Sequence, residues 1–364
     1  MKSIILLFHQ AFFLTTLLYG SAVVTQERIR SGGESLDLKR QNSSSIPDGL
    51  RHRNIDYREQ MRSLITKISR FARRVDKNFI VMSRGGLELL EKVTGNEENA
   101  TRSVATTYIK SIDGVILQNV FFPPSNGDTD GRETDEIKQK NRMRLANLGK
   151  KRGLNIWVME FAPKIDVAKR SYALAKANDF IPFTIDRSGT LFNTIPPFPS
   201  RPMFENSVNV HGLNSVKNYL FMINPSNFDT QDGMVERLGA TNFDALVLDV
   251  FDNSQKPLTK KNVRRLQLKK IGSRRLVLAI MNISAADTSH YYWKSGWTVG
   301  NPRFVYAPSP GMSDRYLTKY WDRAWHDILT GKPDSYVYGI AKQGFDGVLL
   351  DGVENYRFFE SADR

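Results

Sequence analysis

The chain contains no cysteine among its 364 residues and only five histidines. Without cysteine, no disulfide can brace the fold and no thiolate metal site can form. The histidines show no metal-like spacing, so we expect neither a metal nor another cofactor. A chain of this length can bury a large core, and its stability must come from the packing of that core.

Long apolar runs are also scarce, because only residues 1–22 approach the length and apolarity needed to cross a bilayer. This segment has Lys2, then an apolar run, then small residues ending at Ala22. That is the three-part plan of a secretory signal peptide. His9 and Gln10 interrupt the run and disfavour the alternative of an uncleaved anchor. We therefore predict a secreted or periplasmic protein without a membrane span after cleavage.

Residues 23–54 are rich in Ser, Gly, Arg and Asp, which predicts a flexible leader before an ordered domain that begins near Ile55. No zinc-finger or RNA-binding signature is present, so we expect no specific nucleic-acid partner. The segment 83–86 (SRGG) is too short for a dinucleotide fingerprint, which disfavours a nucleotide enzyme.

The charge is strongly unbalanced, with 52 Lys and Arg against 38 Asp and Glu, or +14 in total. This favours anionic partners such as acidic polysaccharide or another component of a cell envelope. The alternative is a soluble basic protein whose basic runs form the solvated faces of helices. We expect a monomer.

Eight short apolar runs alternate with segments of helical spacing such as 61–75 and 86–93. This alternation predicts parallel strands joined by helices, and eight such strands match an α/β fold of the (β/α)8 TIM-barrel type. An open doubly wound sheet is the alternative, but no Gly-rich loop follows a strand. The eight runs are FIVMS at 79, GVILQNV at 114, NIWVMEFA at 155, FIPFTI at 180, YLFMIN at 219, ALVLDVF at 245, RLVLAIMNI at 275 and GVLLDGV at 347.

Two long segments break the alternation. The run PPFPSRP at 196–202 cannot form regular helix or strand and reads as a linker. Residues 289–314 follow a strand directly, which would place them at the active face of a barrel.

Carboxylates recur at the ends of the predicted strands. Asp351 and Glu354 follow one strand, Asp249 follows a second, and Glu160 ends a third, whereas Gln118 takes the corresponding position on a fourth. Because barrel enzymes keep their chemistry at the carboxyl ends of the strands, this set indicates a catalytic site.

On these motifs the chain resembles the endo-α-1,4-polygalactosaminidase-like TIM-barrel family, glycoside hydrolase family 114. Residues 218–359, with FDALVLDVF, RLVLAIMNISAADTSHYYW and FDGVLLDGVENYRFF, resemble the first half of the family barrel. Residues 76–191, with NFIVMSRGGLELL, SIDGVILQNVFF and LNIWVMEFA, resemble its second half.

The reversed order of these blocks implies a circularly permuted barrel over residues 55–364. Residues 55–195 would supply the family's second half, 196–207 a Pro-rich joint and 208–364 the first half. The alternative, two separate half-barrel domains, would leave open sheet edges.

The resemblance implies a pair of catalytic carboxylates. Asp351 matches the family's acid after strand four, and Glu160 is our choice for its partner, since apolar surroundings raise the pKa of a carboxyl group. Asp249 is the alternative partner and a supporting acid, and Glu354 has a supporting role.

Several positions depart from the family pattern. Gln118 and Asn119 replace an acidic motif, and an amide cannot supply a proton. Ala285 replaces a glutamate in the loop after Asn282, and Arg84 lies where the family has an amide. We expect Gln118, Asn119, Arg84 and Asn282 to bind substrate.

Further substrate contacts are expected around the mouth of the barrel. Asp186 and Arg187 match a family position, and we expect an ion pair there that binds sugar or closes the barrel. Aromatic rings suit the C–H faces of sugars, although packing of a long loop would also explain them, and Trp325 has the spacing of a core residue. The aromatic residues predicted to bind sugar are Tyr292, Trp293, Tyr320, Trp321 and Tyr356.

The leading hypothesis is therefore a secreted endo-acting glycoside hydrolase that cleaves an amino-sugar-containing or other exopolysaccharide or oligosaccharide. The family activity concerns a cationic galactosamine polymer, which a chain of charge +14 would repel. A lectin-like barrel that binds glycans without cleaving them is the second hypothesis, and a basic envelope-associated scaffold is the third.

Overall fold

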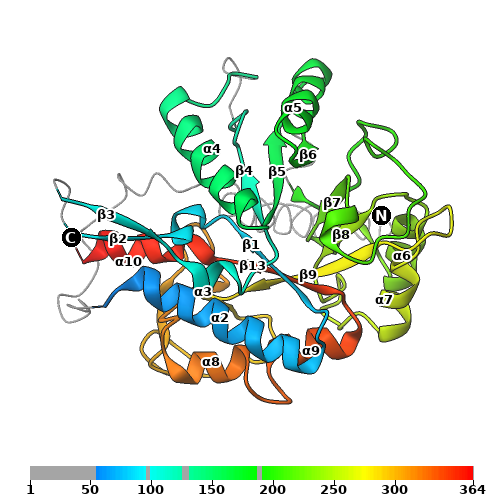
Figure 1. The fold of residues 1–364 in the computed structure, drawn as a ribbon. Helices are drawn as coiled ribbons and strands as arrows, with labels where there is room; N and C mark the ends of the chain where they lie inside the picture. The colour runs from blue at the N-terminus through cyan, green and yellow to red at the C-terminus, as the bar shows by residue number, and fades with distance from the viewer. Residues whose placement is uncertain (1–54, 96–98, 125–130, 187–190, 364) are drawn as a thin grey trace, which may run out of the picture.

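A computed structural model describes residues 55–95, 99–124, 131–186 and 191–363. The predicted signal peptide (1–22) and leader (23–54) lie outside these ranges, as does Arg187. Eight parallel strands, in the order β6-β5-β4-β1-β13-β9-β8-β7, form a nearly closed barrel with helices outside it (Figure 1). The predicted α/β fold of (β/α)8 type is confirmed. The barrel strands are β1 (Ile80–Arg84), β4 (Gly114–Gln118), β5 (Asn155–Phe161), β6 (Ile181–Ile185), β7 (Tyr219–Met222), β8 (Ala245–Leu248), β9 (Leu276–Asn282) and β13 (Gly347–Asp351).

All eight predicted strands are present, because each apolar run is buried on both of its faces. Every residue of β7 and β8, for example, is buried. One side of each strand packs inside the barrel and the other lies under helices, which explains why the sequence shows continuous apolar runs rather than alternation.

The helices bury one face each. In α2, Met61, Leu64, Ile65 and Ile68 are fully buried at helical spacing, and Asp56 caps the first turn by accepting from the backbone N–H of Glu59. None of the helices in the described ranges has the length and apolarity to cross a membrane. The α-helices are α2 (Tyr57–Val75), α3 (Thr106–Ile109), α4 (Glu136–Lys151), α5 (Ile165–Ala177), α6 (Gln231–Gly239), α7 (Lys260–Leu266), α8 (Arg323–Leu329), α9 (Tyr336–Gln343) and α10 (Tyr356–Ala362).

The first and last strands are neighbours. Strand β1 pairs with β13 in parallel, with Ile80 opposite Gly347, so both halves of the chain contribute to one sheet. The two ends of the sheet are β6 and β7, which are not hydrogen-bonded to each other. Side chains fill the seam between these two strands. Tyr219 packs 4.5 Å from the ring of Trp157 and 5.4 Å from that of Phe183, and its hydroxyl donates to the carbonyl of Val158 at 3.1 Å.

One predicted helix is wrong. Residues 86–93 form a short 3-10 helix, Leu87–Leu90, followed by a hairpin of β2 (Glu91–Thr94) and β3 (Thr101–Val104). The three leucines supply the apolar spacing, but the β-branched residues after Glu91 pair with the next strand instead.

The long segment after β9 is partly regular. It contains β10 (Ala285–Asp287), β11 (Val305–Pro308) and β12 (Arg315–Thr318), which form an antiparallel sheet in the order β10-β12-β11. Residues of this insertion extend over the carboxyl ends of the barrel strands.

At the amino ends of the strands, the same arrangement of an aspartate, a backbone N–H group and a basic side chain occurs three times. An aspartate directly before a strand accepts a backbone N–H from a neighbouring segment at 2.8 Å and forms an ion pair with a basic side chain. The three sets are Asp113 with Val81 N–H and Arg73, Asp244 with Lys217 N–H and Lys269, and Asp346 with Val277 N–H and Arg274.

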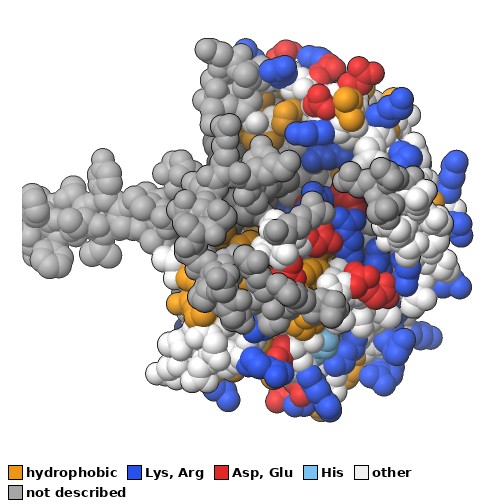
Figure 2. Space-filling view, turned by 90° about the vertical axis from the view of Figure 1, so that its left-hand side faces the viewer, with side chains coloured by type: hydrophobic (Ala, Val, Ile, Leu, Met, Phe, Trp, Pro, Cys, Tyr) orange, Lys and Arg blue, Asp and Glu red, His pale blue; other side chains and the backbone are white. Residues whose placement is uncertain are grey.

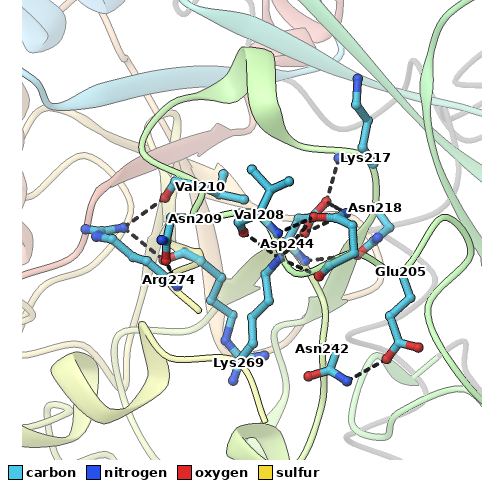
Figure 3. Close-up of polar contacts among 12 residues, drawn as sticks. Glu205, Val208, Asn209, Val210, Lys217, Asn218, Asn242, Asp244, Lys269 and Arg274 are labelled. Atoms are coloured by element: carbon cyan, nitrogen blue, oxygen red, sulfur yellow. Dashed lines mark hydrogen bonds and ion pairs between the residues drawn. The ribbon is translucent and has the colours of Figure 1, made fainter. Parts of the chain in front are cut away.

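The pair formed by Lys269 and Asp244 is fully buried (Figure 3), with 2.6 Å between Nζ and Oδ1. Lys269 also donates to the carbonyls of Asn206 at 3.1 Å and Val208 at 3.0 Å. The contacts fix the segment after the Pro-rich run against the foot of β8.

Candidate functional site

A cavity of about 620 Å³ lies at the carboxyl ends of the barrel strands. Figure 2 views this side of the molecule, where acidic and basic side chains gather near the centre. The cavity collects seven residues predicted from the sequence, of which Asn119 and Glu354 lie in loops and five lie at strand ends. Of these five, four end strands and one directly follows a strand. They are Arg84 on β1, Gln118 on β4, Asn282 on β9, Asp351 on β13 and Asp249 after β8.

Asp351 is held between neighbours on both sides. Its backbone pairs with Asn282 across β13 and β9, and its Oδ1 lies 3.4 Å from the guanidinium of Arg84. Arg84 is itself buried, with its guanidinium 5.3 Å from the centre of the Phe221 ring across the barrel. These contacts fix the position of Asp351 at the floor of the cavity.

The insertion after β9 adds a second guanidinium that sequence reasoning missed. Arg315 binds the buried Asp287 at 2.7 Å, and Nε2 of His290 lies 3.5 Å from the same carboxylate. Burial opposes the charge of Arg315, but Asp287 and then Asp351 raise its pKa overall. Asp287, Arg315, Asp351 and Arg84 therefore form a row of alternating charges.

Asp249 is a second carboxylate at the cavity wall. Its Oδ1 accepts the backbone N–H of Phe251 at 3.0 Å, and the start of α9 places Tyr336 in the same wall. Burial raises the pKa of the Tyr336 hydroxyl well above its ordinary value, and the charge of Asp249 adds to this effect. Tyr336 was not predicted from the sequence, because only the fold brings α9 to β8.

Gln118 and Asn119 form another edge of the cavity. Asn119 adopts a left-handed conformation with φ of 55°. The guanidinium of Arg142, on α4, donates to the carbonyls of Gln118 at 3.2 Å and Asn119 at 2.5 Å. Lys138 and Asn141 of the same helix also line the cavity.

Two predicted residues mainly shape loops. Asn282 accepts the backbone N–H groups of Ser284 and Ala285 at 3.1 and 2.9 Å, which folds the loop after β9 onto its own strand. Glu354 accepts the backbone N–H of Gly86 at 3.0 Å and so joins the loops after β13 and β1. Both side chains still line the cavity.

The structure places Glu160, the predicted catalytic acid, outside the cavity. Its side chain is fully buried, is absent from the described lining of the cavity, and accepts backbone N–H groups from Val120, Phe121 and Phe122 at 2.8 to 3.1 Å. Burial raises the pKa of Glu160 to about 8, although these three donors act in the opposite direction. The apolar surroundings were identified correctly, but they enclose the carboxyl group and make it an anchor for the loop after β4.

The structure does not place the predicted aromatic platforms at the cavity. Tyr320 and Tyr356 are fully buried, and the hydroxyl of Tyr320 donates to the carbonyl of Tyr57 at 2.8 Å. Tyr292 is buried, while Trp321 packs on Tyr57 and Trp293 stacks on Tyr316. None of the five predicted rings belongs to the described cavity lining. The long insertion needs its own core, and these rings supply it, together with the fully buried Trp325.

The predicted ion pair of Asp186 with Arg187 stays a prediction, because Arg187 lies outside the described residues. Asp186 follows β6 and is not part of the described cavity lining. Within the described ranges, no three His, Asp or Glu side chains are grouped so that they could hold a metal ion.

No protein-family model matches the chain. Stretches of it are similar to uncharacterized proteins of three microorganisms. It is 30% identical over 115 residues to one from Deinococcus radiodurans, covering 32% of this chain and 34% of that protein. It is 26% identical over 132 residues to one from Methanocaldococcus jannaschii, covering 36% of each chain. It is 29% identical over 82 residues to one from Thermotoga maritima, covering 22% of this chain and 24% of that protein. The chain thus spans about a third or less of the curated relatives it matches.

Proposed function

We propose that this chain is a glycoside hydrolase, divergent from the endo-α-1,4-polygalactosaminidase-like family, that cleaves an amino-sugar-containing or other exopolysaccharide. One observation carries the proposal: Asp351 and Asp249 line the same cavity from β13 and β8, with only β9 between them. Neighbouring strands lie about 4.8 Å apart, so the two strand ends are about 10 Å apart at the backbone. The carboxyl groups of the two aspartates can lie closer together than their backbones. They can therefore reach the separation of roughly 5 to 9.5 Å found between the two catalytic carboxyl groups of glycosidases.

The two carboxyl groups have different surroundings, which suggests different roles. Arg84 and Arg315 stabilise a negative charge on Asp351, which suits a nucleophile or the base that activates water. Asp249 accepts the backbone N–H of Phe251 and lies beside the buried Tyr336, and we assign it to protonate the leaving oxygen. In each cycle a water molecule is added across the glycosidic bond.

The strand order supports the resemblance from which the proposal began. In a circularly permuted barrel, the family's own ends would meet where strand eight adjoins strand one. The seam between β6 and β7, bridged by the Pro-rich segment, lies at that point. Export by the segment 1–22 belongs to the same proposal.

A glycan-binding protein without hydrolytic activity is the second candidate. Gln118 favours it, because an amide lies at the cavity edge where the family resemblance leads one to expect an acid. The displacement of Glu160 from the cavity removes another proton donor.

The test is reducing-end release from acetylated, deacetylated and acidic polysaccharides by the purified chain. Asp351→Asn and Asp249→Asn should each lower the rate by about 10²- to 10⁴-fold. Asp179→Asn is the matched control, because Asp179 is exposed at the opposite end of the barrel. Release that survives both cavity variants would overturn the proposal, whereas binding without release on every polymer would establish the second candidate.

A further inference from the structure

The charges around the cavity are segregated once the ion pairs are set aside. Arg84 pairs with Asp351, Arg315 with Asp287, and Arg357 with both Glu88 and Glu354. Asp249 and Asp252 place carboxyl groups on the β8 side. Lys138 and Arg142 remain as cations on the side of β4 and α4.

These two sides face each other. In the sheet order, three strands separate β8 from β4 in one direction, namely β9, β13 and β1. Across the seam, three more separate them in the other direction, namely β7, β6 and β5. The acidic side and the cationic side therefore lie on opposite walls of the cavity.

The cations on α4 are uncompensated within the part of the chain that the structure describes. No carboxylate there lies within ion-pair distance of Lys138 or Arg142, and the guanidinium of Arg142 is oriented by two neutral carbonyls. The charge of Arg142 interacts with the buried Glu160, but burial raises the pKa of Glu160 to about 8, which reduces its negative charge at neutral pH. Gln118 and Asn119 at the same edge contribute no charge.

We propose that Lys138, Asn141 and Arg142 form a subsite for an anionic substituent of the glycan, a carboxylate or a sulfate group. A guanidinium held in place with its remaining N–H groups available is suited to bind such an anion, and the lysine adds a second charge one helical turn away. The substrate class would then be an acidic polysaccharide. This inference rests on the proposed function, because it places the scissile bond near Asp351 and the anionic group over α4.

The experiment measures binding of four polymers to the full chain: a polyuronate, a sulfated glycan, a neutral dextran and the polycation chitosan. The double variant Lys138→Gln with Arg142→Gln should bind the anionic polymer at least tenfold more weakly. The matched control, Lys140→Gln with Lys151→Gln, removes the same charge from exposed positions of α4 outside the cavity and should change binding less than twofold. Lys138→Glu alone tests the subsite at an exposed position, where folding is not at risk.

The outcomes separate this inference from the proposed function. A stronger response to polyuronate or to sulfated glycan identifies the anion. Equal weakening by both double variants would reduce the effect to overall charge and overturn the subsite. Cleavage of a neutral or amino-sugar polymer that depends on Asp351 but not on Lys138 would also overturn it, while the hydrolase proposal stands. Absence of both binding and cleavage on all polymers would overturn the two together.

Discussion

At the amino ends of the strands, Asp113, Asp244 and Asp346 each accept a backbone N–H and pair with a cation. At the carboxyl ends, Asp351 and Asp249 line a cavity, and Asp351 lies 3.4 Å from the guanidinium of Arg84. A buried charge is costly unless its hydrogen-bonding capacity is used. The aspartates at the amino end therefore stabilise the barrel, whereas those at the carboxyl end can bind a ligand in the cavity. This division of roles is general for the architecture.

The largest effect on stability is expected at the amino end. Lys269→Met leaves the Asp244 carboxylate buried without its cation, which should lower the free energy of unfolding by about 3–5 kcal/mol. Urea denaturation measures the loss. Lys270→Met, at an exposed neighbouring position, is the control and should change stability by less than about 0.5 kcal/mol. Similar losses of unfolding free energy in the two variants would show that the buried ion pair does not make the amino end especially stable.

Glu160 is an exception to this contrast between the two ends. It lies at the carboxyl end of the barrel, but it accepts backbone N–H groups as the aspartates at the amino end do. Glu160→Gln turns an amide N–H group toward backbone N–H donors and should cost about 1–3 kcal/mol. Polysaccharide binding by the folded fraction should be retained. If the variant were as stable as the wild type but did not bind polysaccharide, Glu160 would have a role in the binding site.

The same residue predicts a pH dependence. Since the pKa of Glu160 is raised to about 8 from an ordinary value of 4.5, its contribution to stability is complete below about pH 4.5 and is lost as the pH rises toward 8. The stability difference between the wild type and Glu160→Gln should therefore shrink from pH 5 to pH 9 in thermal unfolding. A difference that grows over this range would contradict the raised pKa.

A smaller cost is expected at the loop that carries Asp351 into the cavity. Gly352 has a left-handed φ of 77°, and a Cβ there would lie 2.4 Å from Oγ of Ser284. Gly352→Ala should destabilise the protein by about 1–2 kcal/mol and, unlike Lys269→Met, should also lower binding or activity, because it moves Asp351. Gly239→Ala, which has open space around its Cβ position, is the matched control.

The smallest stability change is expected for the residue most important to the proposed chemistry. Asp351→Asn removes the charge of a partly exposed carboxylate, but its amide oxygen can still accept a hydrogen bond from the buried Arg84, so the free energy of unfolding should change by no more than about 1 kcal/mol. If calorimetry showed a loss as large as that of Lys269→Met, Asp351 would be a structural residue and the contrast between the two ends would fail.

The sequence predicts the barrel well because each strand is an apolar run long enough to be seen without knowledge of its neighbours. It also predicts which strand ends carry polar groups, and Asp351, Asp249, Gln118, Arg84 and Asn282 do meet at one cavity. Orientation is harder to predict, because the apolar sequence around Glu160 does not distinguish a buried loop anchor from a site residue.

Contributions from distant segments are the other limit. Arg315, Asp287 and Tyr336 reach the cavity only through the insertion after β9 and through α9, and no local pattern marks them. The aromatic residues were predicted to bind sugar at the surface. Rings that bind sugar and rings that pack in a core have the same sequence pattern, and Tyr320 and Tyr356 are fully buried. The hairpin of β2 and β3 was missed because its residues follow leucines with helical spacing.

The pairing of Ile80 with Gly347 has a consequence for the order of events during synthesis. At about 5–20 residues per second, β1 leaves the ribosome on the order of ten seconds or more before the strand that will cover its edge. Until β13 arrives, that edge is available to other chains. The strand order therefore leaves one edge of β1 unpaired in the nascent chain, a state that the finished fold no longer displays.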